Sequence, residues 1–434
     1  MTVTALQTDG YKLGHRQMFP DKTTFCYTNF TCRSLKHFQQ ISSDDKVVNF
    51  GLQAVVQKLL IDDWNANFFN LPLEEISRIY TRRINNYLGP NNIGVEHIEA
   101  LHNLGYLPIQ IKALPEGARV NARVPLWTIQ NTHPEFFWLV NYLETQLSCE
   151  SWKMPTSAST AYEFRRIFDK YANLTGAPKD FVQFQGHDFS MRGMSGLEDA
   201  AASGAAHLLS FVGTDTVPAI DFLEKYYEAD SDKEMVGVSV AATEHSVMCM
   251  GGKEDEIETF RRLITQVVPT GIISIVSDTW DFWKVVTEYL PFLKDTIMNR
   301  PGKVVIRPDS GDPVEILCGT KETGGETPQE RGLIQCLYDI FGGTTTPLGY
   351  LLLDEHIGSI YGDSINLTRA EEICSRLMKR GFASINWVAG IGSFTYQRST
   401  RDTLGTAMKA TFGVVDGEDR VLYKAPKTDS GEKN

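Results

Sequence analysis

From about residue 180 onward, short apolar runs alternate with stretches that have helical spacing, and this alternation constrains the fold more than any other feature. The helical stretches include residues 217–227, 253–267, 279–290 and 367–379. Short runs rich in β-branched residues are typical of strands buried on both faces of a parallel sheet. The predicted strands are residues 181–185, 207–211, 236–241, 272–276, 303–306, 350–353 and 385–388.

The number of these runs favours a closed sheet. Seven runs, with an eighth predicted near Trp152, fit an α/β barrel better than an open sheet. An open doubly wound sheet has the same periodicity and stays an alternative, because periodicity carries no information on closure.

The two ends of the sequence lack this alternation and indicate a second domain. Residues 108–130 alternate in polarity and are broken by Pro and Gly, which is typical of antiparallel hairpins. We therefore predict a β-rich α+β domain from residues 1–150 and 401–434, beside an α/β barrel domain from residues 151–400. Its predicted strands include 24–30, 107–112, 410–415 and 420–424, with helices near 51–65 and 73–88. The polar, Gly-rich segment 319–332 is predicted to be a surface loop.

Length and charge limit the classes of function. The 434 residues exceed the roughly 250–300 at which single cores stop growing, which also favours two domains. A net charge of -12 argues against a nucleic-acid partner, so phosphate groups would need a local set of cations or helix N-termini. The seven cysteines are scattered, which is typical of reduced thiols in a cytosolic protein. No targeting segment or membrane span is visible. No cysteine pair or histidine has metal-ligand spacing, so the sequence does not identify metal ligands.

Polar residues follow most of the predicted strands. Any one of them is more often a helix N-cap than a catalytic group, but a rim of N-caps would not gather His, Arg and several carboxylates. In a barrel, all these points lie at the C-terminal rim, where such enzymes place their active sites. The residues are Asp188, the segment 213–215, Glu244, His245, Ser277, Asp278 and the segment 307–311.

The same rim offers groups suited to a phosphorylated sugar. Residues 307–311 supply a cation and a carboxylate two positions apart, and Gly311 permits close backbone approach. Gly362 and Asp363 pair a backbone N–H with a carboxylate, and residues 389–393 resemble a phosphate-binding turn at a late barrel loop.

Long strings in the sequence resemble the nicotinamide phosphoribosyltransferase family. They are TDGYKLGH, CRS, HDFSMRGMSGLEDAAASGAAHLLSFVGTDTVPAI, AATEHSVM, SIVSDTWDFW and VVIRPDSGDP, followed by the weaker GDSIN and STRDTLGTAMK. The resemblance covers residues 8–409. It implies a type II phosphoribosyltransferase fold and a cytoplasmic homodimer with active sites at the subunit interface. It also implies a pentosyltransferase of NAD salvage that acts on nicotinamide and phosphoribosyl pyrophosphate, with no nucleic acid or membrane partner.

The resemblance implies specific roles for residues at the base. Phe189 and the partner subunit's Tyr11 would stack on the nicotinamide ring, although Tyr11 taken by itself would be expected in the core. Arg192 and Ser274 would bind the base, and Asp215 would accept from the amide NH2. A carboxylate at that position would repel nicotinate, so Asp215 carries the choice of substrate.

The remaining implied roles concern phosphate groups. His245 would be phosphorylated by ATP during coupled turnover, with Glu244 and Asp278 orienting its ring. The ribose 5-phosphate would contact Arg307, Asp309, Gly362, Asp363, Gly392 and Ser393. Pyrophosphate would contact Arg33, Arg401, Lys409 and Lys424. Mg²⁺ would neutralise the leaving group, and no general base is needed because the attacking pyridine nitrogen carries no proton.

Three alternatives stay open at this stage. Nicotinate phosphoribosyltransferase shares the fold and the cosubstrate, and Asp215 argues against it. A barrel aldolase or lyase would need a Schiff-base lysine, and the sequence offers only Lys303 at a strand start. A catalytically silent binding protein would not need His245, Asp215 and Arg307 together. The late loop GlyIleGlySerPhe is poorer in glycine than the family pattern, and the pairs 190–191 and 241–242 also depart from it.

Overall fold

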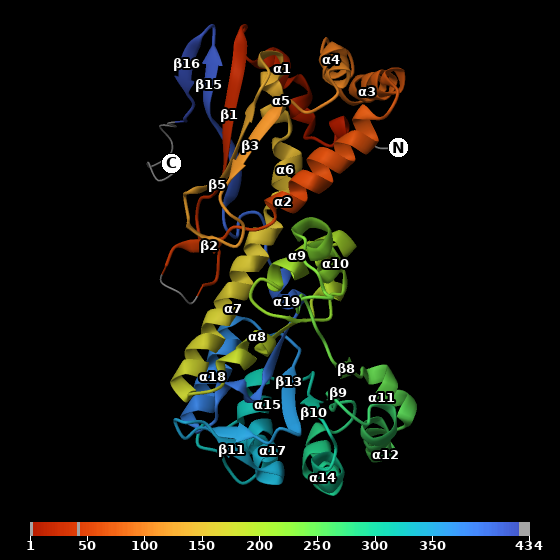
Figure 1. Ribbon diagram of the computed structural model, residues 1–434, viewed down its shortest axis with the longest axis vertical. Helices are drawn as coiled ribbons and strands as arrows, with labels where there is room; N and C mark the ends of the chain where they lie inside the picture. Colours follow the sequence, from red (N-terminus) through yellow and green to blue (C-terminus); the bar gives the residue numbers. More distant parts are fainter. Residues whose placement is uncertain (1–2, 41–43, 425–434) are drawn as a thin grey trace. The chain divides into compact units, whose positions relative to one another are not determined.

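The computed structural model describes residues 3–40 and 44–424, which divide into two compact units. Unit 1 comprises residues 3–38, 44–156 and 400–424, and unit 2 comprises residues 39–40 and 157–399. Residues 425–434 of the predicted segment 401–434 lie outside the described residues. Figure 1 shows the elements of each unit.

Unit 1 is built on a five-stranded antiparallel sheet in the order β16-β15-β1-β5-β3. Segments from both ends of the chain pair at its centre, with Thr23 opposite Val415 and Cys32 opposite Thr406. The predicted strands at 24–30, 107–112 and 410–415 are confirmed, and β3 and β5 form the predicted antiparallel pair. The strands are β1 (Thr23–Cys32), β3 (Ile109–Ala113), β5 (Pro125–Asn131), β15 (Thr406–Val415) and β16 (Glu418–Val421).

Helices complete this unit, and one of them corrects a prediction. The helix α3 (Leu73–Leu88) has the predicted bounds. Trp152 does not lie in a strand, because it separates α6 (Glu144–Ser151) from α7 (Lys153–Thr175). Helical hydrogen bonds satisfy the backbone of this segment without a partner strand.

Unit 2 contains a seven-stranded parallel sheet in the order β7-β6-β14-β13-β10-β9-β8. Its two edges meet, because Gly213 in β7 forms a parallel bridge with Val238, just before β8. The Thr214 N–H donates to the Val238 carbonyl at 3.0 Å, and the Val238 N–H donates to the Val212 carbonyl at 2.7 Å. The sheet therefore curls into an α/β barrel rather than an open sheet. The strands are β6 (Gly186–Asp188), β7 (Gly213–Thr214), β8 (Ala241–Ala242), β9 (Ile273–Val276), β10 (Val304–Arg307), β13 (Ile357–Tyr361) and β14 (Val388–Ile391).

Several predicted strands are wrong in position or type. The run 181–185 is mostly helical, since α8 (Val182–Gln185) precedes β6, and the run 207–211 contains the end of α9 (Leu197–His207). The run 350–353 contains β12 (Leu351–Leu353), which pairs antiparallel with β11 (Gly343–Thr345) outside the barrel sheet. The run 385–388 ends where β14 begins, after a 3-10 turn at Ser384–Asn386. Short buried runs look alike whether they form strands or helical turns, so apolarity alone misplaced them.

Helices surround the barrel sheet and bury its outer face. The helix α17 (Leu333–Phe341) packs against α14 (Leu290–Met298) and α15 (Pro313–Cys318), and α15 packs against α18 (Leu367–Lys379) (Figure 1). The predicted helix at 367–379 is confirmed as α18, and the Asn366 side chain caps it by accepting from the Arg369 N–H at 2.9 Å. The predicted loop 319–332 contains one short helix, α16 (Pro328–Arg331). The other helices near the barrel include α10 (Pro218–Tyr227), α11 (His245–Gly251) and α12 (Glu256–Arg262).

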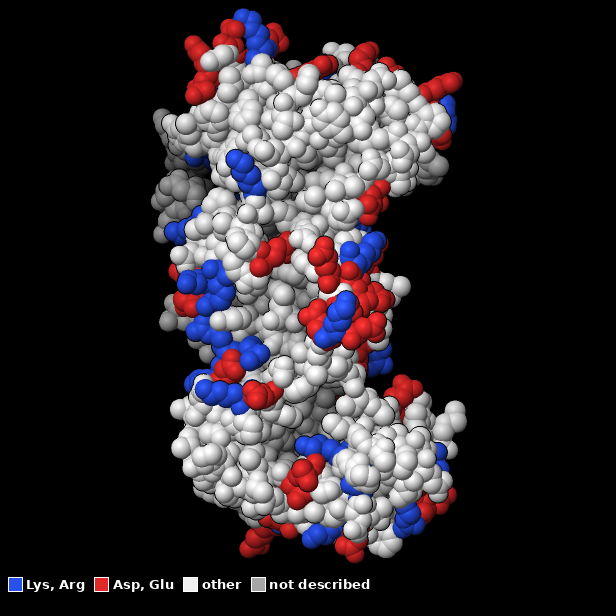
Figure 2. Space-filling view, in the orientation of Figure 1, with Lys and Arg blue, Asp and Glu red and all other residues white. Residues whose placement is uncertain are grey.

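The surface carries mixed charge. On the face that Figure 2 shows, acidic and basic side chains are interspersed between wide uncharged areas. Among the described residues, no helix is both long and apolar enough to cross a membrane.

Candidate active site

The predicted site residues of unit 2 follow the C-terminal ends of the barrel strands. Because neighbouring strands of this sheet are parallel, their C-terminal ends lie at one edge. The structure therefore gathers these residues at one rim. Phe189 and Arg192 follow β6, Asp215 follows β7, Glu244 and His245 follow β8, Asp278 follows β9, Asp309 follows Arg307 of β10, Gly362 and Asp363 follow β13, and Gly392 and Ser393 follow β14.

A cavity of about 500 Å³ lies inside the barrel. Its lining is mostly apolar, with a few polar groups, which is the usual composition of a small-molecule site. The polar and aromatic residues near its rim end are His187, Phe189, Asp215, Ser239, Ser274 and Arg307. Lys303 lies at the opposite end, before β10, where burial lowers its pKa. It stands away from the rim carboxylates, so the geometry gives no support to a Schiff-base mechanism there.

The Phe189 ring packs on the backbone of Gly390 and Gly362. A Cβ added at Gly390 would lie 2.5 Å from Cε2 of Phe189, and one added at Gly362 would lie 3.0 Å from the same ring. A side chain at position 390 would therefore displace the ring, and one at position 362 would press closely against it. Gly362 also faces Asp309, whose Oδ1 would lie 3.1 Å from an added Cβ. The sequence suggested a phosphate role for Gly362, and the structure adds this steric one.

Asp215 is held by two neighbours that the sequence did not single out. Its Oδ1 accepts from Ser239 Oγ at 2.8 Å and lies 2.9 Å from His187 Nε2. Burial raises the pKa of Asp215, but the hydrogen bonds from His187 and Ser239, aided by the charge of Arg307, hold the pKa below its ordinary value. Asp215 is therefore a carboxylate at neutral pH.

Two polar groups that line the cavity have unused hydrogen-bonding capacity. Ser274 Oγ is buried and has no hydrogen-bond partner among the described residues. Arg307 donates from Nη2 to the Thr243 carbonyl at 2.7 Å, while its buried Nε has no such partner. Buried polar groups are nearly always paired, so unpaired ones that line a cavity indicate a place for a polar ligand.

A second cluster surrounds His245, the first residue of α11. Its Nε2 lies 3.8 Å from Asp278 Oδ1 and 4.0 Å from Asp309 Oδ2, and its Nδ1 lies 3.2 Å from Thr279 Oγ1. The other Asp278 oxygen accepts from the Asp309 N–H at 2.9 Å and from Ser310 Oγ at 2.5 Å. Asp278 is thus fixed with one oxygen toward the His245 ring, whose side chain is 47% exposed.

Glu244 occupies a different position from Asp278. Its carboxylate accepts from the hydroxyl of Ser246 within the first turn of α11. The residues that approach the His245 ring are instead Asp278, Asp309 and Thr279. Thr279 was missed from sequence, although it directly follows the predicted Asp278.

The late loops come together near Arg192. A Cβ added at Gly193, next to Arg192, would lie 2.5 Å from the Cβ of Ser393. Ser393 begins the short helix α19 (Ser393–Tyr396), directly after Gly392. The segment carrying Arg192 and the predicted phosphate-binding turn are therefore in contact.

The other predicted residues belong to unit 1. Tyr11 is 64% exposed, so it is not a core tyrosine, and its ring lies edge-on to His15 at 5.0 Å. Arg33 donates from its N–H and its Nε to the Gly405 carbonyl at 3.3 and 3.2 Å, at the end of the β1–β15 pair. Arg401 lies in the turn before β15, Lys409 within β15, and exposed Lys424 ends the described chain.

Lys409 takes part in an ion-pair network that the sequence did not indicate. Its Nζ lies 3.2 Å from Glu144, which also pairs with Lys12 at 2.7 Å. Lys12 is buried, and it donates to the Asn141 carbonyl at 2.6 Å. A buried ammonium needs such partners, which come from a segment far away in the sequence.

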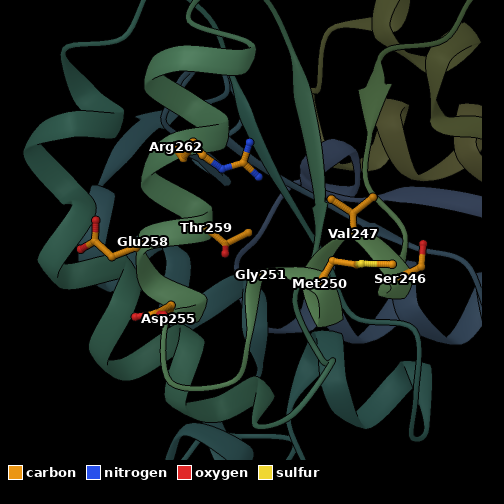
Figure 3. A pocket seen from close by; sticks show the side chains of 8 residues that line it. All are labelled: Ser246, Val247, Met250, Gly251, Asp255, Glu258, Thr259 and Arg262. Carbon is orange, nitrogen blue, oxygen red and sulfur yellow. The ribbon is translucent and has the colours of Figure 1, made fainter.

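A larger hollow of about 660 Å³ lies between α11 and α12 (Figure 3). Figure 3 shows Thr259 and Arg262 of α12 directed toward the side of α11, and Glu258 directed away. Met250 is 91% exposed here, so the hollow is largely a surface feature. We therefore assign the candidate active site to the barrel cavity and its rim.

Comparisons with known proteins match two family models and named relatives. Residues 184–434 match the model of the nicotinate phosphoribosyltransferase (NAPRTase) family, and residues 3–111 match that of the nicotinamide phosphoribosyltransferase N-terminal domain. The chain is 55% identical to nicotinamide phosphoribosyltransferase of Acinetobacter baylyi over 98% of its length and 85% of the relative's. It is 35% identical to that of Mycoplasma pneumoniae over 98% and 92% of the two chains.

Solved structures share the fold at low sequence identity. Human nicotinic acid phosphoribosyltransferase superposes with a TM-score of 0.57 at 17% identity, covering 95% of this chain and 75% of that one. Nicotinate-nucleotide pyrophosphorylase from Pyrococcus furiosus gives 0.56 at 13% identity, covering 96% and 78%. These two structures establish the fold. The two nicotinamide phosphoribosyltransferases at 55% and 35% identity establish the family. The chain belongs to the nicotinamide phosphoribosyltransferase family.

Proposed function

We propose that this protein transfers the 5-phosphoribosyl group of phosphoribosyl pyrophosphate to nicotinamide, giving nicotinamide mononucleotide and pyrophosphate. The observation that carries the proposal is the state of Asp215 in the barrel cavity. One of its oxygens is occupied by Ser239 and His187, and no described residue hydrogen-bonds the other. An amide NH2 suits that free oxygen, whereas the carboxylate of nicotinate would bring like charge to it.

The rest of the cavity suits a flat heteroaromatic amide. The Phe189 ring, supported by Gly362 and Gly390, offers a rigid stacking face. The unpaired Ser274 hydroxyl and Arg192 would bind the carboxamide side of the base. The second stacking face would come from the partner subunit's Tyr11, in a homodimer. The high exposure of Tyr11 supports this assignment, since a core role does not account for it.

The chemistry follows from charge. The ring nitrogen of nicotinamide attacks C1 of the ribose through an oxocarbenium-like state as the bond to pyrophosphate breaks. No proton leaves the nucleophile, so Asp215 and Asp309 would position substrates rather than transfer protons. Arg307, Asp309, Asp363, Gly392 and Ser393 would hold the ribose 5-phosphate. Arg33, Arg401, Lys409 and Lys424 would hold the leaving group.

Mg²⁺ would accompany the phosphates of the substrate. No cluster of three or more potential metal-binding side chains occurs in residues 3–40 and 44–424, whereas Mg²⁺ commonly binds through phosphates, waters and one or two carboxylates. Asp309, partly exposed at the rim, fits that requirement. Bound Mg²⁺ would supply charge neutralisation for the departing pyrophosphate.

ATP would phosphorylate His245 and so stimulate turnover. Nδ1 of His245 is engaged by Thr279, which leaves Nε2 as the nitrogen for phosphorylation. Asp278 and Asp309 lie beside that nitrogen and would stabilise a cationic ring. We also propose a cytoplasmic location, because all seven cysteines are free and most are buried, which is usual in reducing compartments.

Product formation from both bases tests the proposal. Purified protein is incubated with phosphoribosyl pyrophosphate, Mg²⁺ and either nicotinamide or nicotinate, with and without ATP, and the mononucleotide and pyrophosphate are quantified. We expect a strong preference for nicotinamide, loss of turnover in Asp309→Ala, and acid-labile phosphate on His245 after ATP treatment. A preference for nicotinate would overturn the proposal, and unchanged turnover in Asp309→Ala would remove that residue from the site.

A further inference from the structure

The immediate surroundings of Asp215 contain a three-residue arrangement drawn from separate segments. His187 lies within β6, Asp215 directly follows β7, and Ser239 lies in the segment that approaches β8. Both His187 and Ser239 reach the same oxygen of Asp215, at 2.9 and 2.8 Å. Ser239 Oγ also lies 3.5 Å from His187 Nε2. The three groups thus meet at a single point.

Backbone geometry fixes each partner in place. His187 lies opposite Gly213 in the β6–β7 pair, and a Cβ added at Gly213 would lie 2.7 Å from His187 Nδ1. The imidazole therefore packs directly on the Gly213 backbone, and the Phe189 ring lies 5.0 Å from it on another side. Gly213 also forms the bridge to Val238, which brings the adjacent Ser239 to Asp215. One glycine thus aligns both donors.

We infer that His187 and Ser239 are positioning residues that set the choice of base by occupying one oxygen of Asp215, so that the other oxygen becomes the acceptor for the amide NH2. The inference rests on the proposed function. A carboxylate held at one oxygen cannot rotate to share a proton with nicotinate or to turn away from it. The two donors also keep Asp215 charged, so the repulsion of nicotinate persists at neutral pH.

Removing either donor should weaken the recognition of the amide. Hydrogen bonds to charged groups contribute enough for roughly a 10-fold effect on affinity. We expect Ser239→Ala and His187→Leu each to raise the KM for nicotinamide by about 10-fold, with kcat changed by less than about 3-fold. The ratio of kcat/KM for nicotinamide to that for nicotinate should fall by a similar factor. Ser239→Thr and His187→Gln, which keep a donor, should restore most of that ratio.

A double-mutant cycle separates positioning from general damage to the site. In an Asp215→Asn background, Ser239→Ala and His187→Leu should cause no further change in the ratio, because they act through the carboxylate. Ser231→Ala serves as the matched control, since Ser231 is an exposed serine in the same connection between α10 and β8. Its kinetics should equal those of the wild type.

Two results would overturn the inference. One is a selectivity ratio within about 2-fold of wild type in both Ser239→Ala and His187→Leu, and the other is an equal loss of selectivity in the Asp215→Asn background. If the wild type itself prefers nicotinate, the proposed function fails and this inference falls with it. If the wild type prefers nicotinamide and the variants keep that preference, this inference alone fails.

Discussion

Replacing Gly390 by Ala perturbs the base-binding surface without touching any polar group. The new methyl would lie 2.5 Å from Cε2 of Phe189 and 2.7 Å from the Cα of Gly362. Carbon atoms in contact lie about 3.5–4.0 Å apart, so the ring must move by roughly 1 Å into the cavity and the Gly362 backbone must shift as well. A displacement of that size at a stacking face lowers kcat/KM by roughly 10–100-fold. We expect most of the loss to appear as a raised KM for nicotinamide.

Steady-state kinetics with nicotinamide as the varied substrate measures this effect. Overpacking costs about 1–3 kcal/mol, so the variant should still fold, and its thermal melting is recorded alongside. Gly358→Ala in β13 is the control, because the nearest atom to its added methyl is the flexible Lys303 side chain at 3.3 Å. That variant should keep its KM within about 3-fold of wild type. A wild-type KM for nicotinamide in folded Gly390→Ala would refute the role of Gly390 in positioning the Phe189 ring.

Two further changes test other parts of the structure. Ser274→Ala removes a buried hydroxyl that has no hydrogen-bond partner among the described residues, so we expect unchanged or higher thermal stability together with a roughly 5–10-fold rise in the KM for nicotinamide; a marked loss of stability would contradict this. Burial raises the pKa of Glu256 in α12 to about 7. Between about pH 4.3 and 7 the folded protein therefore keeps a proton that the unfolded chain releases, and stability falls as pH rises through that window. Glu256→Gln should accordingly raise the free energy of unfolding by roughly 2–3 kcal/mol at pH 8 and leave it unchanged at pH 4, as measured by denaturant titration; equal effects at both pH values would contradict this.

The fold was predictable where a strand coincides with an uninterrupted apolar run. The strands β9 and β10 lie within one residue of their predicted bounds, because each coincides with an apolar run and pairs with strands on both sides. The strands β7 and β8 were misplaced because each has only two residues. Neighbouring strands supply the hydrogen bonds that define them, and that information is not local to the sequence.

The positions of the candidate site residues were predictable where those residues follow a strand end. Asp215, Asp278 and Asp309 came from the rule that parallel strands present their C-terminal ends at one rim. That rule does not identify His187 and Ser239. His187 lies inside β6, and Ser239 lies in an irregular segment that the bridge from Val238 to Gly213 holds near Asp215. The burial of Lys12 could not be predicted for a similar reason, because it depends on Glu144, a distant residue in the sequence.

Because β7 and β8 are short, the segments next to them should open before the rest of the barrel unfolds. The segments that carry Asp215 and Ser239 pair over only two residues with β6 and β9 and through one bridge with each other, whereas β10 pairs over four residues with β9 and over three with β13. Segments with little such pairing open locally at a lower free energy than the core. We therefore expect the amides of Thr214 and Val238 to exchange with solvent faster than those of Val304 and Ile306. On warming, the ratio of kcat/KM for nicotinamide to that for nicotinate should therefore fall before the barrel unfolds.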